Sequence, residues 1–164
     1  MKALDPGIKA PQIELPLIGG GKFSLAQALS EGRVLLAFFK ISCPVCQYTF
    51  PFLERLAKRA EGRGLKVVGI SQDDAKSTKV FCDTYGITFA TALDGLSRYP
   101  VSNAYGLTNV PTTFLIGQDG HIEQTIVGWS RDEIEAIDRE YSNSQNAKFP
   151  LFPKGEEVSP FRAG

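Results

Sequence analysis

The sequence predicts an α/β fold, built as one domain around a mixed central sheet. An unbroken apolar run at 34–39 and a second strand at 67–70 enclose a helical segment, and a strand–helix–strand unit places its two strands parallel. Two further strands, at 113–116 and 122–127, enclose a Gly-Gln-Asp-Gly turn, and an Asp-Gly pair between strands is typical of an antiparallel hairpin. A sheet that contains both kinds of pairing is mixed.

Size and charge limit the functions open to the chain. Its 164 residues are 43% hydrophobic, which is enough for a single domain with a sizeable core. Lys and Arg together number 18, as do Asp and Glu, so the net charge is zero and no broad positive field exists to hold nucleic acid. Three cysteines are too few for a disulfide-stapled scaffold and fit a reducing compartment.

The two ends of the sequence carry expectations of their own. The first residues lack the apolar stretch of a secretory signal and no segment reaches membrane-spanning length, so we expect a cytoplasmic protein without membrane contact. It is expected to be periplasmic or membrane-tethered instead if a leader has been trimmed. From 142 onward the apolar periodicity is lost and prolines recur, which predicts an extended C-terminal tail, 142–164, behind a core at about 5–141. The tail is expected either to pack over the core or to attach to another subunit.

The N-terminal elements are short. Residues 7–23 carry two prolines and three successive glycines between small apolar pieces, which predicts an irregular hairpin or arm. Ser24 with Gln27 matches a capping box and opens a short helix. Because every residue of the following run, 34–39, is apolar, we expect it to lie buried on both faces at the centre of the sheet.

Three longer helices follow. The first opens at Cys43-Pro44-Val45-Cys46, and Pro51 is expected to kink it. Its apolar face consists of Cys46, Phe50, Leu53, Ala57 and Ala60, which recur at intervals of three and four residues. The second begins at Asp73-Asp74, ends at Gly86 and carries Phe81, Cys82 and Tyr85 inward. The third begins at a capping box of Ser130 and Glu133 and continues through Ile134, Ile137 and Tyr141.

The pair Cys43 and Cys46 is the most informative feature of the sequence. Residues three apart lie on one helix face, so the two sulfurs can close a short disulfide. A helix start presents unpaired N–H groups and a partial positive charge, which stabilise a thiolate at Cys43, and the thiolate is the reactive species. The nearest charge in sequence is Lys40, whose ammonium favours the thiolate if it reaches the sulfur; a lysine directed into water is the alternative.

Several short phrases, together with the order of the elements, resemble one family. The phrases are Ala10-Pro11, Phe23-Ser24-Leu25, Phe38-Phe39-Lys40, Val67-Val68-Gly69-Ile70-Ser71 and Pro111-Thr112-Thr113-Phe114-Leu115-Ile116. They resemble the TlpA-like and redoxin branch of the thioredoxin fold, which includes the alkyl hydroperoxide reductase and thiol-specific antioxidant relatives. The resemblance implies a three-layer α/β/α sandwich with an N-terminal hairpin extension and an insertion at about 73–93. It also implies a thiol-disulfide oxidoreductase with a part in redox homeostasis.

The resemblance assigns roles to individual residues. Cys43 maps onto the attacking thiol, Cys46 onto the resolving thiol, and Pro111 onto a cis-proline that faces the dithiol and turns the backbone of Val110 toward an extended substrate. The expected substrate-binding residues are Pro44, Val45, Val110 and Pro111. The implied partners are a disulfide-containing protein or small molecule and an external reductant or oxidant that recycles the dithiol. No cofactor and no metal are implied.

Three positions depart from the family pattern. Ser42 stands where many thioredoxins place a tryptophan, Thr49 where some TlpA-like relatives place an acid, and Ala37 at the buried-aspartate position of thioredoxin. The resemblance therefore transfers no internal proton acceptor to Cys46. Because Pro44-Val45 also differs from the common Gly-Pro of thioredoxin, the reduction potential and the direction of electron flow do not carry over.

An inert disulfide and a zinc site are the structural alternatives for the cysteine pair. Zinc normally takes four ligands, and the remaining thiol and imidazole donors are Cys82 and His121, one on a helix and one on a hairpin. We expect Cys82 to fill the core and His121 to be exposed. Trp129 is expected to be a packed aromatic residue and Arg98 a solvated charge.

Two other functions compete with disulfide exchange. A peroxiredoxin-like peroxidase carries threonine three residues and proline seven residues before its reactive cysteine. Lys40 and Leu36 stand at those positions for Cys43, whereas Cys43 and Phe39 stand there for Cys46, so neither cysteine fits. A noncatalytic module that holds an extended peptide beside the cis-proline is the third hypothesis, against which the intact dithiol argues.

Overall fold

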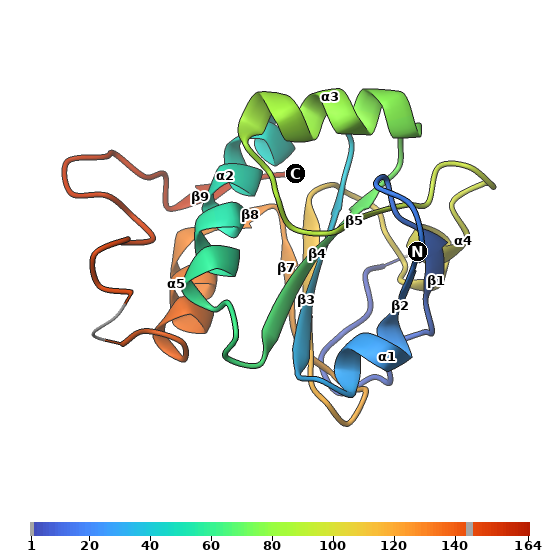
Figure 1. The fold of residues 1–164 in the computed structure, drawn as a ribbon, viewed down its shortest axis with the longest axis horizontal. Coiled ribbons are helices and arrows are strands. Elements are labelled where there is room, and N and C mark those ends of the chain that lie inside the picture. Colours follow the sequence, from blue (N-terminus) through green and yellow to red (C-terminus); the bar gives the residue numbers. More distant parts are fainter. Residues whose placement is uncertain (1, 144–145) are drawn as a thin grey trace.

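A five-stranded mixed sheet forms the centre of the molecule. The computed structural model describes residues 2–143 and 146–164. In spatial order the strands are β5 (Thr91–Leu93), β4 (Leu65–Ser71), β3 (Arg33–Phe39), β6 (Thr112–Ile116) and β7 (Ile122–Val127) (Figure 1). Strand β3 runs parallel to β4 and antiparallel to β6, and β6 and β7 form a hairpin. The predicted mixed sheet is confirmed.

Helices cover both faces of the sheet, which confirms the predicted three layers. The helices are α1 (Leu25–Leu29), α2 (Pro44–Arg59), α3 (Ala75–Tyr85), α4 (Pro100–Ala104) and α5 (Arg131–Arg139). Buried residues of α2, α3 and α5 share one core cluster, and those of α1 and α4 share a second on the other face (Figure 1). Residues 34–39 in β3 are all fully buried and alternate between the two clusters, as expected for a central strand.

The predicted helix caps are present. The side chains of Ser24, Asp74 and Ser130 accept hydrogen bonds from main-chain N–H groups in the first turns of α1, α3 and α5. Gly86 closes α3 with a left-handed φ of 69°. Helix α2 continues past Pro51 as one helix. Its predicted apolar face is buried, with Ala57 half-buried.

The N-terminal region forms the expected hairpin and the region at 73–93 builds part of the sheet. Strand β1 (Glu14–Pro16) pairs antiparallel with β2 (Lys22–Ser24). Residues 73–93 contain α3 and also the short edge strand β5, which runs parallel to β4. Phe81 and Cys82 are buried as predicted, whereas Tyr85 is half-buried.

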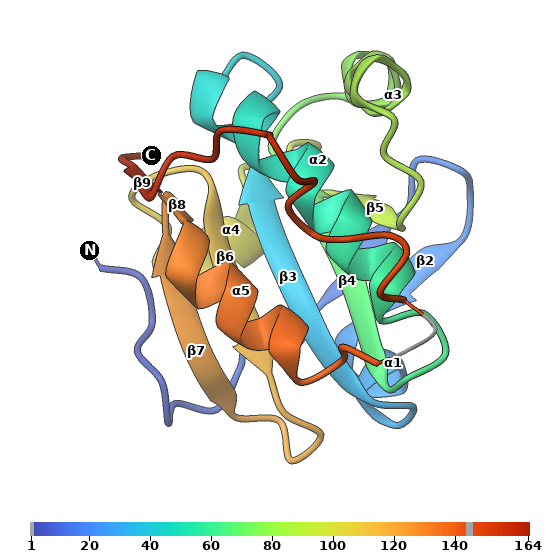
Figure 2. The ribbon, with the colours of Figure 1, turned by 90° about the vertical axis from the view of Figure 1, so that its left-hand side faces the viewer.

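The C-terminal tail folds back over the core. Figure 2 shows it crossing α2, after which β9 (Phe161–Arg162) pairs antiparallel with β8 (Trp129–Ser130) in a separate two-stranded sheet. Leu151 and Val158 are buried in the same cluster as α2. Of the two expectations for the tail, packing over the core is the one that the structure shows.

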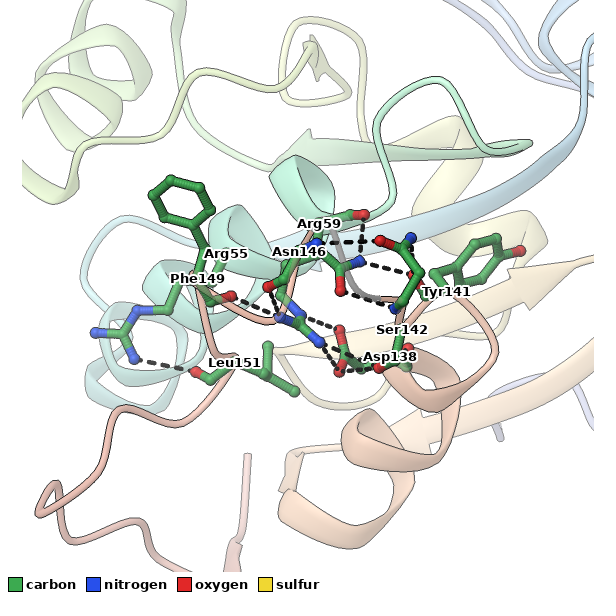
Figure 3. A network of polar contacts seen from close by, with 9 residues as sticks. Arg55, Arg59, Asp138, Tyr141, Ser142, Asn146, Phe149 and Leu151 are labelled. Atoms are coloured by element: carbon green, nitrogen blue, oxygen red, sulfur yellow. Dashed lines mark hydrogen bonds and ion pairs between the residues drawn. The ribbon is translucent and has the colours of Figure 1, made fainter.

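A buried ion pair holds the beginning of this tail (Figure 3). The guanidinium of Arg59 donates to both carboxylate oxygens of Asp138, at 2.6 and 3.0 Å. It also donates to the main-chain carbonyls of Asn146 and Phe149, at 2.7 and 2.6 Å. Arg59 therefore joins α2, α5 and the tail at one point.

None of the helices in residues 2–143 and 146–164 has the length and apolar character that crossing a bilayer requires.

Candidate active site

The dithiol lies at the junction between β3 and α2. Cys43 is the N-cap residue of α2, with an extended backbone (φ −83°, ψ 115°), and Pro44 occupies the first turn, where its missing N–H costs nothing. The N–H of Cys46 donates to Sγ of Cys43 at 3.1 Å. This hydrogen bond strengthens when the sulfur is an anion, because bonds to ionised acceptors are the stronger ones. The helix start thus directs a main-chain donor at the Cys43 sulfur.

The loop before Cys43 is fixed by three hydrogen bonds. The N–H of Cys43 donates to the carbonyl of Lys40 at 3.3 Å, and the side chain of Gln47 donates to the carbonyl of Ile41 at 3.0 Å. The carboxylate of Asp73, which follows β4, accepts from the N–H of Ile41 at 2.8 Å. The sequence alone predicts Asp73 only as part of a helix start. Its position after a strand parallel to β3 was the available signal, because carboxyl ends of neighbouring parallel strands meet at one edge of a sheet.

The loop before β6 brings a carbonyl to the same sulfur. The Val110–Pro111 peptide bond is cis, as the family resemblance implied. The thiol of Cys43 donates to the carbonyl oxygen of Val110 at 3.4 Å. Val110 is half-buried and Pro111 is buried. The structure therefore brings the main chain of Val110 to the Cys43–Cys46 pair, although Val110 is 67 residues away from Cys43 in sequence.

The residues between the cysteines differ in exposure. Pro44 is exposed, and Val45 is half-buried against the core cluster of α2. Both lie on the first turn of α2, beside Cys43. Their predicted contact with substrate stays a prediction.

The two thiols have different surroundings. Cys43 is half-buried, whereas Cys46 is fully buried. Burial raises the pKa of the Cys46 thiol far above its usual value, and the neighbouring Cys43 sulfur raises this pKa further. The sulfur of Cys43 is therefore the more accessible of the two, and burial favours the protonated form of Cys46.

This difference predicts an alkaline loss of stability in the reduced protein. An unfolded cysteine ionises above about pH 8.5, whereas the buried Cys46 keeps its proton in the folded state. Above that pH the unfolded state binds fewer protons, so the free energy of unfolding must fall as pH rises, by at most about 1.4 kcal/mol per pH unit for one group. Urea denaturation in reductant at pH 7.5, 8.5 and 9.5 measures this slope.

A matched variant isolates the contribution of Cys46. Burial also raises the pKa of Cys82, which adds to the slope of the unaltered protein. Cys46→Ala should therefore reduce the fall in the free energy of unfolding per pH unit and leave only the part that Cys82 contributes. An identical slope in the two proteins would contradict the buried, protonated state of Cys46.

The other residues that the sequence singled out lie as follows. Lys40 is exposed, and its effect on the thiolate stays a prediction. Thr49 is buried and its hydroxyl donates to the carbonyl of Val45 at 2.7 Å, so it adds no acid near Cys46. Ala37 is fully buried in β3.

The remaining candidates have structural surroundings. Cys82 is buried, as predicted, with its sulfur 3.8 Å from the hydroxyl of Thr91. His121 is exposed beside Asp119, and Arg98 is exposed, both as predicted. Trp129 is fully buried and stacks on Phe52, with ring centroids 4.8 Å apart, which confirms a packed aromatic residue.

Comparison with known proteins fixes the family. Residues 6–125 match the AhpC/TSA family, which is most of the chain. The chain belongs to the AhpC/TSA family. The predicted redoxin branch of the thioredoxin fold is thereby confirmed.

Relatives of this AhpC/TSA protein share its sequence at moderate identity. The thiol-disulfide oxidoreductase ResA of Geobacillus kaustophilus is 29% identical over 135 residues, which cover 81% of this chain and 76% of ResA. The thioredoxin-like protein YneN of Bacillus subtilis is 30% identical over 129 residues, covering 76% of this chain and 73% of YneN. These relatives confirm the predicted enzyme class, a thiol-disulfide oxidoreductase.

Solved structures of other proteins share the fold of this chain. A Chlorobium tepidum protein assigned as the thiol:disulfide interchange protein DsbE has a TM-score of 0.75 and 27% identity, over 84% of this chain and 96% of its own. The peroxidoxin BcpB of Mycobacterium tuberculosis has a TM-score of 0.72 at 23% identity, over 85% of this chain and 99% of its own. The second likeness shows the fold alone.

Proposed function

We propose that this enzyme exchanges disulfides through a mixed-disulfide intermediate, with Cys43 as the attacking thiol and Cys46 as the resolving thiol. The observation that carries the proposal is the asymmetry of the pair: Cys43 is half-buried at a helix start and accepts a main-chain N–H, whereas Cys46 is fully buried. The more exposed sulfur of Cys43 is the one proposed to meet the substrate. Cys46, three residues later on the same helix, is proposed to attack the disulfide formed on Cys43.

The reaction balances without a cofactor. The Cys43 thiolate attacks one sulfur of the substrate disulfide, a new sulfur–sulfur bond forms, and the first substrate thiolate leaves and takes a proton. Cys46 then loses its proton and attacks Sγ of Cys43, which releases the second substrate thiol. The substrate gains two electrons, and the enzyme is left with a Cys43–Cys46 disulfide. An external dithiol reduces this disulfide and returns the enzyme to its starting form. With an oxidant in place of the dithiol, the same steps run in reverse and oxidise a substrate dithiol.

Substrate binding is proposed at the surface around Cys43 and Val110, which is named the substrate groove. Val110 turns its main chain toward Cys43, and an extended substrate can pair with it as an added strand. Pro111, Pro44 and Val45 are the proposed apolar contacts on either side. The proposed partners are a disulfide-containing protein or small molecule and the reductant or oxidant that recycles the pair.

Turnover of insulin with dithiothreitol as reductant tests the function. We expect catalysed precipitation of the insulin B chain well above the rate with dithiothreitol alone. A protein without any catalysis would instead support the noncatalytic binding module. Peroxide consumption by the reduced protein is the second arm, because rapid loss of peroxide with a sulfenic acid on cysteine would favour the peroxidase.

The cellular compartment stays part of the proposal. A role in cytoplasmic redox homeostasis fits the few cysteines of the chain. Fractionation of cells that carry the full gene, with detection of this chain in the cytoplasmic or the extracytoplasmic fraction, decides between the two expected locations.

A further inference from the structure

The end of the C-terminal tail lies against the main chain that flanks the dithiol. Gly128, at the corner between β7 and β8, has a left-handed φ of 79°, and a side chain there would collide with the carbonyl oxygen of Arg162. At Gly164 a Cβ atom would lie 2.7 Å from the carbonyl oxygen of Val110. Residues 162–164 therefore run directly between the Val110 loop and the corner at Gly128.

This position coincides with the groove proposed for substrate. The carbonyl oxygen beside Gly164 is the same one that accepts the thiol of Cys43 at 3.4 Å. Figures 1 and 2 both place the end of the chain at the edge of the sheet where β3 leads into α2. The tail and an extended substrate paired with Val110 would therefore occupy the same space.

The tail is held there by specific contacts. The N–H of Ser159 donates to the hydroxyl of Tyr48 on α2 at 2.9 Å, and the indole of Trp129 donates to the carbonyl of Ser159 at 2.7 Å. Beyond Ser159 the guanidinium of Arg162 lies 4.0 Å from the centroid of the Tyr48 ring. The side chain of Asn109 donates to the carbonyl of Gly164 at 3.2 Å.

The anchored and the exposed parts of the tail meet near Ser159. Val158 is buried, whereas residues 160–164 are all exposed and their only regular element is the two-residue strand β9. A short exposed strand of this kind opens at low free energy, while the buried anchor stays in place. The last five residues can therefore leave the groove without unfolding the rest of the tail.

We propose that residues 160–164 determine substrate choice by occupying the groove beside Val110. With the segment in place, Cys43 accepts small disulfides, which need no main-chain pairing. Extended protein segments reach Cys43 only after residues 160–164 have moved away. This inference rests on the proposed disulfide exchange. It adds that small disulfides are the substrates that react while residues 160–164 stay in place.

Deletion of residues 160–164 tests the inference. The deletion leaves Ser159 and its contacts with Tyr48 and Trp129 in place. With insulin as the protein disulfide, kcat/KM should rise about tenfold, as expected for a site that is open about a tenth of the time and then becomes permanently open. With 2-hydroxyethyl disulfide, kcat/KM should change less than about twofold, because that substrate does not need the vacated space.

A full-length variant guards against a folding defect in the deletion. The double variant Asn109→Ala and Arg162→Ala removes two contacts of the segment and should raise insulin turnover in the same direction, by less than the deletion. Lys154→Ala is the matched control, since it removes an exposed positive charge from the same tail away from the groove. Lys154→Ala should leave both activities unchanged.

Unchanged insulin turnover in both the deletion and the double variant would overturn the inference. An equal rise with both substrates would do the same, because it would mean a general effect on the dithiol. Failure of the proposed function looks different, since the unaltered protein would then reduce neither insulin nor 2-hydroxyethyl disulfide.

Discussion

Replacement of Cys43 by serine is expected to lower insulin reduction to the rate with dithiothreitol alone, a loss on the order of a thousandfold or more, as for other essential nucleophiles. Serine keeps the size of the side chain and its place at the start of α2. Its hydroxyl does not ionise near neutral pH and forms no disulfide. The rate of B-chain precipitation at matched enzyme concentration measures the loss.

Cys82→Ala is the matched control for this experiment. Cys82 is buried on α3, with its sulfur 3.8 Å from the Thr91 hydroxyl, and takes no part in the proposed cycle. The control should keep nearly full activity, apart from a modest loss of stability. Retained activity in Cys43→Ser together with a loss in Cys82→Ala would contradict the proposal, because the reaction would then depend on Cys82 and not on Cys43.

Replacement of Arg59 by leucine is expected to cost about 3–5 kcal/mol of folding free energy, the range found when one partner of a buried ion pair is removed. The side chains of Arg59 and Asp138 are only 8% and 7% exposed. The variant leaves the Asp138 carboxylate buried without its partner and also removes the donors to the carbonyls of Asn146 and Phe149 (Figure 3). Urea denaturation of the reduced protein at neutral pH measures the change.

An exposed ion pair provides the control for Arg59. Arg139 pairs with Glu135 at 2.9 Å on the surface of α5, with the arginine side chain 70% exposed. Arg139→Leu should change the free energy of unfolding by less than about 1 kcal/mol. Adding Asp138→Leu to Arg59→Leu should recover part of the lost stability, because no uncompensated charge then remains buried. A cost for Arg59→Leu as small as that for Arg139→Leu would contradict the role of Arg59 in holding the tail.

The central elements of the fold could be predicted because their signals are local. The apolar run at 34–39 and the Asp119-Gly120 turn each determine a strand or hairpin within a few residues of sequence. The cap residue Ser130 and the Cys43–Cys46 spacing do the same for helix starts. These patterns predicted β3, the β6–β7 hairpin and the dithiol at the start of α2, all of which the structure contains.

The tail could not be predicted in the same way because its contacts are made over long distances. Arg59 and Asn146 are 87 residues apart, and Tyr48 and Ser159 are 111 residues apart. No periodic pattern marks residues 146–164, since the segment follows the surface of α2 without forming a helix of its own. The short strand β5 escaped a precise assignment for a similar reason, because its three residues are placed by pairing with β4 and with the N-terminal arm at Leu17.

The two cysteines and the cis-proline of the candidate site could be predicted from the sequence, whereas the residues that contact them from other parts of the chain could not. Asp73 reaches the loop before Cys43 only because β3 and β4 are neighbours. Gly164 reaches Val110 only because the tail crosses α2 first. Both placements depend on tertiary packing, which a single sequence records weakly.

Trapping of the mixed disulfide tests most directly whether Cys43 is the attacking thiol and Cys46 the resolving thiol. The reduced protein and its Cys46→Ser variant are each treated with oxidised glutathione, and the products are mapped by mass spectrometry after alkylation. We expect a lasting glutathione adduct on Cys43 in the variant, and an intramolecular Cys43–Cys46 disulfide without adduct in the unaltered protein. A lasting adduct on Cys43 in the unaltered protein, or an adduct on Cys82 in the variant, would contradict this assignment.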